Sequence, residues 1–256
     1  MIDEIIKAVK KNGDILLFAQ DPAGSASSKE GRANYVTKYD VAVQQSLQEA
    51  LLKIMPEAAF VGEECGCQAY NGKGWAFIVD PIDGTTNFMK NFRHSCLSVA
   101  AAKDGEVVIG VVYNPYTKEL FRAIKDGGAF LNNEPIHAAA GHLAEELVTF
   151  GTSPYYEELI DQTFETAKKL HRASLDVRRS GSAALDLCDI AAGRSGLFFE
   201  YRLQPWDFAA GSLIASEAGA LVGQMDGSPL QLGCACSVLA AGPQAWEDYF
   251  SLDAEK

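Results

Sequence analysis

The sequence predicts a layered fold that mixes α-helices with β-strands. Three observations support this fold class: two amphipathic segments come before any strand pattern, a run of short strands with turn clusters follows, and the second half alternates strands with helices. Of the 256 residues, 48% belong to the hydrophobic set, which is enough apolar material for a sizeable core. The chain is therefore expected to fold as one domain over 1–256, with an N-terminal lobe of about 1–140 and a C-terminal lobe of about 141–256.

The N-terminal region is predicted to hold two helices joined by an irregular segment. Residues 1–19 carry apolar side chains at helical spacing, whereas residues 20–34 contain almost none and predict a mobile loop or a loose hairpin. Thr37 is the expected N-cap of the second helix, with Asp40 in its first turn and Pro56 as its stop.

Two strands that both end in acids follow this helix. The apolar run 58–62 leads into Glu63 and Glu64, and the run 76–79 leads directly into Asp80. The sequence therefore predicts neighbouring strands that bring carboxylates to a common edge of a sheet.

The remaining elements fall into two patterns. The first is an antiparallel meander separated by turn-forming clusters, with strands at 95–102, 107–113, 119–124 and 129–131. The second alternates, with strands at 147–150, near Val177, and at 197–200, 220–222 and 238–241. The helices expected between them and after them cover 155–171, 183–192, 206–218 and a segment that begins near Pro243.

The charge balance limits the possible partners. Thirty-four acidic against 22 basic residues give a net charge of −12, which argues against nucleic acid or an anionic membrane as the main partner. An anionic substrate would be repelled unless bound divalent metal reversed the local charge. No apolar run approaches the ~20 residues of a membrane span, and the N-terminus lacks the pattern of a secretory signal, so a cytoplasmic protein is expected.

The cysteines favour reduced thiols over a metal site. Their spacing departs from the usual zinc patterns, and no paired histidines accompany them. Buried free thiols are therefore predicted in preference to a four-cysteine zinc site. The six residues form two C-x-C pairs and two single positions: Cys65 with Cys67, Cys234 with Cys236, and Cys96 and Cys188.

The segment Asp80-Pro81-Ile82-Asp83 is the first candidate for chemistry. Mg²⁺ prefers oxygen ligands, and a turn with proline inside it would let Asp80, Asp83 and the Ile82 carbonyl converge. A bare D-x-x-D is more often a solvated acidic turn. Its position between a buried strand and a Gly-Thr-Thr helix start favours the metal interpretation here.

Gly84, Thr85 and Thr86 provide the complementary half of such a site. The free N–H groups of a helix start and two hydroxyls favour phosphate, although Thr85 can also be a simple helix cap. Glu63 is the natural third acid. Asp207, at a helix start behind Pro205, is a candidate fourth, and a favourable interaction with the helix dipole explains it equally well.

Three segments together resemble the signature segments of the inositol monophosphatase family. They are VGEE (61–64), DPIDGTTNF (80–88) and WDFAAGSLIASEAGA (206–220), and the resemblance runs over nearly the whole chain. It implies a layered α-β-α-β-α sandwich of the sugar-phosphatase type, usually a homodimer, that acts as a lithium-sensitive, Mg²⁺-dependent phosphatase on a small phosphate ester.

The resemblance also implies roles for the acids. Glu63, Asp80 and the Ile82 carbonyl would bind a first metal ion, and Asp80, Asp83 and Asp207 a second. Glu63 would also face a third, weaker ion, so that two to three Mg²⁺ ions are expected.

Other roles are implied for the water and the substrate. Thr85 with Asp40 would activate the attacking water, with Glu63 nearby. Asp83 and Asp207 would face the substrate as well as a metal ion. Phosphate would be held by Gly84, Thr85 and Thr86. The alcohol part would be contacted by Gly181, Ser182, Ala183 and Glu200, and Lys29 in the loop at 20–34 is a further possible active-site residue.

Two alternatives and the substrate stay open from the sequence. Aspartate-nucleophile phosphatases carry a strand followed by D-x-D-G-T, but here the acids are three apart and do not share one face of a strand. A non-catalytic metal-binding regulatory module could retain the same fold. Relatives with similar motifs act on inositol phosphate, fructose 1,6-bisphosphate, histidinol phosphate, adenosine 3',5'-bisphosphate or NADP; Glu200 favours a polyol because a carboxylate accepts hydroxyl hydrogen bonds.

Overall fold

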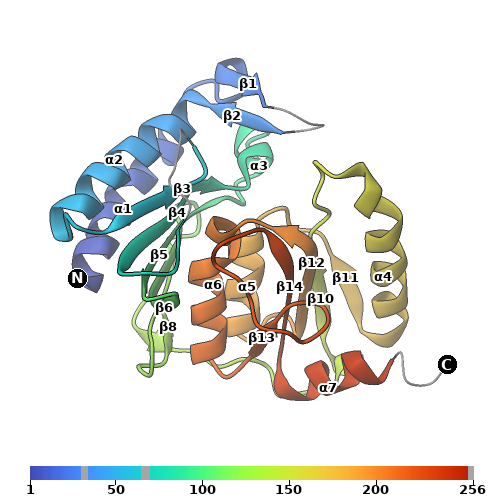
Figure 1. The fold of residues 1–256 in the computed structure, drawn as a ribbon. Coiled ribbons are helices and arrows are strands. Elements are labelled where there is room, and N and C mark those ends of the chain that lie inside the picture. The colour runs from blue at the N-terminus through green and yellow to red at the C-terminus, as the bar shows by residue number, and fades with distance from the viewer. Residues whose placement is uncertain (30–33, 65–69, 253–256) are drawn as a thin grey trace.

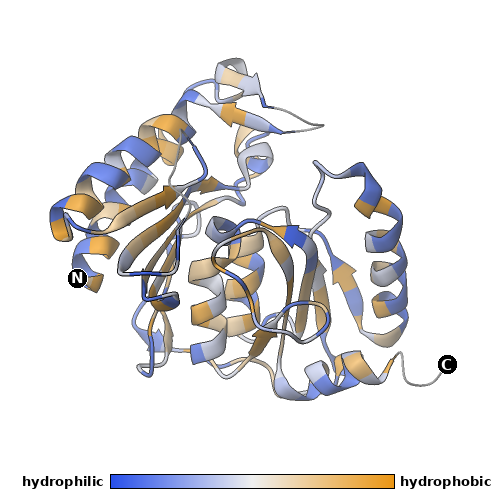
Figure 2. Ribbon diagram, viewed as in Figure 1, coloured by the Kyte–Doolittle hydropathy of each residue, from blue (hydrophilic) through white to orange (hydrophobic). Residues whose placement is uncertain are grey.

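The computed structural model of the protein describes residues 1–29, 34–64 and 70–252, and it has five layers (Figure 1). Two sheets alternate with three helical layers, so the predicted layered sandwich is confirmed. Three apolar clusters lie between successive layers, and Figure 2 shows hydrophobic strands inside and hydrophilic helix surfaces outside.

The first helical layer covers the outer face of the larger sheet. It consists of α1 (Ile2–Leu17) and α2 (Lys38–Ile54), whose apolar faces pack with those strands in one cluster. Thr37 caps α2 as predicted: its side chain accepts from the Tyr39 and Asp40 amides, and the Asp40 carboxylate accepts in return from the Thr37 amide. For residues 20–34 the sequence predicted a mobile loop or a loose hairpin, and the hairpin is closer to the structure. β1 (Ala26–Ser28), within this segment, pairs antiparallel with β2 (Tyr35–Thr37), directly after it.

The larger sheet has seven strands in the order of the chain. The predicted antiparallel meander is confirmed, and one short edge strand, β9, was not expected. The strands are β3 (Ala59–Gly62), β4 (Trp75–Asp83), β5 (Cys96–Lys103), β6 (Glu106–Asn114), β7 (Glu119–Ile124), β8 (Ala129–Leu131) and β9 (Glu134–Pro135).

The smaller sheet has five strands in the order β11-β10-β12-β14-β13. β10 is parallel to both β11 and β12, whereas β14 is antiparallel to its neighbours. The strands are β10 (Leu147–Phe150), β11 (Asp176–Arg178), β12 (Leu197–Leu203), β13 (Leu221–Gly223) and β14 (Cys236–Ala241).

Helices fill the space between the sheets and cover the outside of the smaller one. The central layer is α5 (Ala183–Ala191) and α6 (Pro205–Glu217), most of whose residues are buried. The outer layer is α4 (Ile160–Ala173) and α7 (Pro243–Ser251). α4 begins five residues later than predicted because 151–156 is irregular and a 3₁₀ turn (Glu157–Leu159) precedes the helix.

The thiol prediction holds for three of the four described cysteines. Cys96, Cys188 and Cys236 are free and buried, whereas Cys234 is exposed, contrary to expectation. Cys65 and Cys67 lie outside the described residues. No described helix has the length and apolar character needed to cross a membrane.

Candidate active site

Two parallel strands bring the first acids to one edge of the larger sheet. β3 pairs with β4 in a register that sets Gly62 opposite Val79, and the Glu63 amide donates to the Val79 carbonyl at 3.3 Å. Glu63 and Asp80 therefore follow paired residues and lie at a common edge, as predicted, although β4 ends at Asp83 and not before Asp80. The parallel direction makes this possible because both strands leave the sheet at the same end.

The segment 80–83 is not the turn that the sequence suggested. β4 continues through Asp83, and its pairing with β5 shifts register between Asp80, which faces Ser98, and Asp83, which faces Cys96. Three steps on β4 thus oppose two on β5, which is the extra residue of a β-bulge. The bulge lets two carboxylates three positions apart serve one site, and it accommodates Pro81, which has no N–H to donate.

Asp83 and Asp207 are fixed by the central helical layer. Asp83 Oδ2 accepts from Ser182 Oγ at 2.6 Å and from the Ala184 amide at 2.8 Å, at the start of α5. Asp207 stands in the first turn of α6, where its Oδ2 accepts from the Gln204 amide at 2.7 Å. Each of the two carboxylates is therefore held through its Oδ2 atom, without any bound ligand.

The acids perturb one another. Burial, and then repulsion by neighbouring carboxylates, holds the pKa values of Asp80 and Asp207 well above their usual range. Burial also raises the pKa of Asp83, to about 6, against the hydrogen bonds from Ser182 and Ala184. A buried set of carboxylates that resists ionisation is stabilised by a cation placed among them.

The donor set fits a hard divalent cation. It consists of carboxylate oxygens and the Ile82 carbonyl, the ligand types that Mg²⁺ prefers. In the described part of the chain, no three His, Cys, Asp or Glu side chains are already grouped around a position for an ion. One acid is engaged by a protein cation instead: Lys29 Nζ contacts Glu63 Oε1 at 2.9 Å and also pairs with Glu64.

Thr85 lies between the acids and Asp40. Its hydroxyl is within 3.1 Å of both Asp40 Oδ1 and the Ile82 carbonyl, and it makes no capping bond to its own helix. The other oxygen of this carboxylate, Asp40 Oδ2, accepts from the amide and the hydroxyl of Thr37, so Asp40 is hydrogen-bonded through both oxygens. Burial raises the pKa of Asp40, against the bonds from Thr37. The Thr85 hydroxyl therefore points towards Asp40 and the Ile82 carbonyl and does not act as a helix cap.

The Gly-Thr-Thr start leads into a very short helix, α3 (Thr85–Met89). Gly84 has φ +85°, and a Cβ on it would lie 3.0 Å from the His94 carbonyl and 3.1 Å from that of Gly181. Only glycine fits this position without strain. With five residues in α3, phosphate binding would depend on local N–H groups and hydroxyls more than on a helix dipole.

One pocket of about 390 Å³ contains nearly all the predicted site residues, a volume that suits a small phosphate ester. Asp40 does not line it but stands behind Thr85. The predicted residues that line it are Lys29, Glu63, Asp80, Ile82, Asp83, Gly84, Thr85, Thr86, Gly181, Ser182, Ala183, Glu200 and Asp207.

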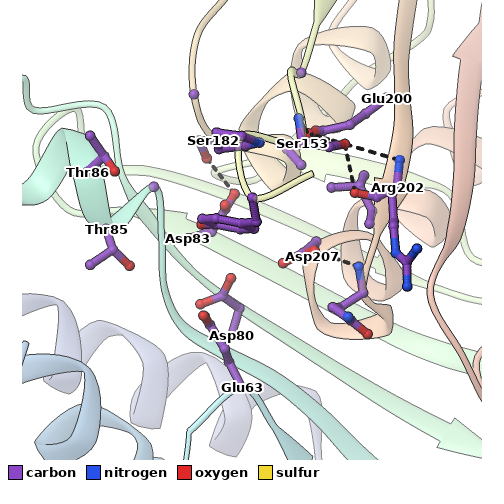
Figure 3. Close-up of a pocket in the computed structure, with 18 of the residues that line it drawn as sticks. Glu63, Asp80, Asp83, Thr85, Thr86, Ser153, Ser182, Glu200, Arg202 and Asp207 are labelled. Atoms are coloured by element: carbon purple, nitrogen blue, oxygen red, sulfur yellow. Dashed lines mark hydrogen bonds between the residues drawn. The ribbon is translucent and has the colours of Figure 1, made fainter. Parts of the chain in front are cut away.

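Figure 3 shows the threonines on one side of this pocket and Glu200, Ser153 and Arg202 on the other, with the aspartates between them. We call the two parts the acidic end and the alcohol end. The acidic end comprises Glu63, Asp80, Asp83 and Asp207. The alcohol end comprises the loop 151–156, Arg179, Glu200 and Arg202.

Glu200 is buried at the alcohol end and clamped by the neighbouring loop. Its Oε1 accepts from the Ser153 amide at 2.7 Å and from the Ser153 hydroxyl at 3.2 Å. A Cβ on Gly151 would lie 1.8 Å from Glu200 Oε2, so this loop approaches the carboxylate more closely than a larger residue allows. Burial raises the pKa of Glu200 to about 7, against the Ser153 amide bond.

Sequence reasoning missed several pocket residues: Ser153, Tyr155, Asp186, Arg179 and Arg202. Burial, and then the surrounding carboxylates, raises the pKa of the Tyr155 phenol, which places it within their field. The sequence carried no local signal for this loop. It meets Glu200 because β10 and β12 are parallel and Phe150 pairs with Phe199, a pairing that only the structure shows.

A sequence profile described as the inositol monophosphatase family matches residues 1–254. An inositol-1-monophosphatase from Caulobacter vibrioides is 39% identical over 84% of this chain and 85% of its own. A protein named Nus factor SuhB, from Pasteurella multocida, is 34% identical over 94% of this chain and 91% of its own.

The fold also matches solved structures over almost its full length. An IMPase from Thermotoga maritima superposes with a TM-score of 0.88 at 28% identity, covering 99% of this chain and 96% of that one. The layered architecture of this chain is therefore shared with that IMPase.

Proposed function

The chain belongs to the inositol monophosphatase family and is a phosphatase, and we propose that it is a Mg²⁺-dependent phosphomonoesterase for a small phosphorylated polyol, with inositol monophosphate as the first candidate. The observation that carries this proposal is the Thr85–Asp40 hydrogen bond beside four carboxylates from three separate elements. An activating pair next to a cation site is what hydrolysis by water requires.

The acidic end would hold the metal. Glu63, Asp80 and the Ile82 carbonyl would bind one ion, and Asp80, Asp83 and Asp207 would bind a second. Glu63 would also face a third. Bound there, Mg²⁺ supplies positive charge at the phosphate and lowers the pKa of a coordinated water. Lys29 would compete with this ion for Glu63, because its Nζ contacts Glu63 Oε1 at 2.9 Å.

The protein's own groups would act on the water and the ester. The Thr85 hydroxyl, held by Asp40, orients a water and passes its proton towards the Asp40 carboxylate. Burial raises the pKa of Asp40, which makes its carboxylate a stronger base than an exposed aspartate. The N–H and hydroxyl groups of Gly84, Thr85 and Thr86 would hold the phosphate, where charge builds on its outer oxygens.

Glu200, with residues Gly181–Ala183 opposite, would receive the hydroxyls of the alcohol. Its position, clamped by Ser153 at the far wall of the pocket, supports this role. The family resemblance further supports a homodimer, lithium sensitivity and a cytoplasmic location, which we include in the proposal.

The test is Mg²⁺-dependent phosphate release by the purified protein. We expect release from inositol 1-phosphate, lost by at least about 100-fold in Asp83→Asn, because the variant removes a ligand charge while keeping the shape. Asp176→Asn, at an exposed aspartate outside the pocket, is the matched control and should match the wild type.

A panel then ranks the candidate esters by kcat/KM: inositol 1-phosphate, fructose 1,6-bisphosphate, histidinol phosphate, adenosine 3',5'-bisphosphate and NADP. Absence of Mg²⁺-dependent release from every ester would support a non-catalytic metal-binding module instead. Trapping of a phosphorylated Asp80 after rapid quench would replace the water mechanism by a covalent one.

A further inference from the structure

Two arginines line the alcohol end of the pocket, and the proposed function gives neither a task. Arg179 follows β11, and Arg202 lies in the last part of β12. Both side chains are exposed at the mouth of a pocket whose other charged lining groups are six carboxylates and Lys29. A neutral polyol would not need positive charge at this position.

Arg179 is held across the mouth by uncharged groups. Its Nη2 donates to Thr152 Oγ1 at 3.2 Å, and its Nη1 lies so near Gly181 that a Cβ there would be 2.5 Å away. Its positive charge opposes the rise in the pKa of Glu200 that burial causes. Arg179 and Glu200 line the same pocket, so Arg179 places a positive charge at the alcohol end.

Arg202 is held by the other end of the same loop. Its guanidinium carbon lies 4.3 Å from the centre of the Tyr156 ring, a cation–π arrangement. Its amide donates to the Ser153 hydroxyl at 3.2 Å, and its carbonyl accepts from that hydroxyl at 3.0 Å. The loop 151–156 therefore positions both guanidiniums while it clamps Glu200.

Neither arginine has a carboxylate within 4.0 Å among the described residues, whereas two others elsewhere do. Arg178 pairs with Asp176, and Arg194 pairs with Glu119 and Asp189. A guanidinium presents a planar fork of donors that matches phosphate well. Two such forks, set by one loop and facing one cavity, form a site for an anion.

We infer that the alcohol part of the substrate carries a second phosphate, bound by Arg179 and Arg202 while the first phosphate is hydrolysed at the acidic end. This inference rests on the proposed function and narrows it from a polyol monophosphate to a polyol bisphosphate. Within the panel it favours esters that carry more than one phosphate group.

The experiment compares two esters that differ only in the second phosphate: fructose 1,6-bisphosphate and fructose 1-phosphate. We expect kcat/KM to be at least tenfold higher for the bisphosphate in the wild type. Arg179→Ala and Arg202→Ala should each lower this ratio by about tenfold, since a hydrogen bond to a charged group contributes on that order. Arg202→Lys should retain part of the preference for the bisphosphate, because lysine keeps the positive charge but lacks the planar fork of donors of the guanidinium.

Arg178→Ala is the matched control, because Arg178 is an exposed neighbour that lies outside the pocket and should keep the wild-type ratio. Inositol 1-phosphate and inositol 1,4-bisphosphate provide a second matched pair. Phosphate release that favours neither bisphosphate, or a ratio that survives the double alanine variant, overturns the inference alone. Absence of Mg²⁺-dependent release from all four esters overturns the proposed function and this inference with it.

Discussion

The two ends of the pocket are built in different ways. At the acidic end, the carboxylates come from the ends of strands and from the first turn of α6, and they are fixed by main-chain geometry. At the alcohol end, one irregular loop of six residues holds Glu200, Arg179 and Arg202. The proposed chemistry would therefore depend on rigid elements, whereas the proposed recognition of the alcohol would depend on a segment that tolerates sequence change more easily.

The largest effect should come from breaking the activating pair next to the acidic end. Thr85→Val removes the hydroxyl that joins Asp40 to the site, and we expect kcat for phosphate release to fall by about 10² to 10⁴. The melting temperature should fall by only a few degrees, because valine loses the Thr85 contacts with Asp40 and the Ile82 carbonyl but keeps the shape of the side chain. Thr85→Ser keeps the hydroxyl and is the control. A valine variant within threefold of the wild-type kcat would remove Thr85 from the mechanism.

A smaller effect should appear at the alcohol end, in the pH dependence of stability. The pKa of Glu200 is raised from 4.5 to about 7, so the folded protein keeps a proton that the unfolded chain has lost between those values. Stability therefore falls as the pH rises through this window. Glutamine cannot ionise, so over this pH window the free energy of unfolding of Glu200→Gln should fall by up to about 3 kcal/mol less than that of the wild type.

The measurement is denaturant unfolding of metal-free protein at pH 4.5 and pH 8. Asp176→Asn removes an exposed acid with a lowered pKa, so it should leave the fall intact. An equal fall in the free energy of unfolding for the wild type and Glu200→Gln would mean that Glu200 is already ionised in the folded protein at pH 4.5. The hydrogen bonds from the loop would then fully compensate for the cost of burying its charge.

The acidic end could be predicted from the sequence because its signals are local. A buried apolar run followed by an acid marks this edge of the sheet: Glu63 directly follows β3, and Asp80 follows the apolar run of β4, although that strand continues to Asp83. The bulge at 80–83 could not be predicted, because an acid–proline–apolar–acid segment is equally typical of a turn. Only the pairing of Asp80 and Asp83 with β5 distinguishes the two.

The alcohol end could not be predicted because its contacts join distant segments. Ser153 meets Glu200 across 47 positions, and Arg179 meets Thr152 across 27. Both contacts depend on the parallel pairing of β10 with its two neighbours. Helical periodicity also placed the start of α4 inside this loop, at residue 155, and so hid Tyr155 as a pocket residue.

The smallest expected effect tests how firmly that loop is held. Ser153→Ala removes the hydroxyl that contacts Glu200 and the Arg202 backbone but leaves the Ser153 amide bond in place. The free energy of unfolding should fall by about 2 kcal/mol, because the hydroxyl accepts from the Arg202 amide and donates to the Arg202 carbonyl or to Glu200, and each hydrogen bond contributes about 1 kcal/mol. The pKa of Glu200 should rise further, because a donor to its charged form is lost.

The control is Ser251→Ala, which removes an exposed hydroxyl that bonds the Glu247 carbonyl on α7. It should stay within about 0.5 kcal/mol of the wild type. A Ser153→Ala variant as stable as this control would show that the amide bond and the close approach of Gly151 suffice to fix Glu200. The alcohol end would then be fixed by main-chain geometry, as the acidic end is. The two ends would differ only in how far apart in the sequence their contacting residues lie.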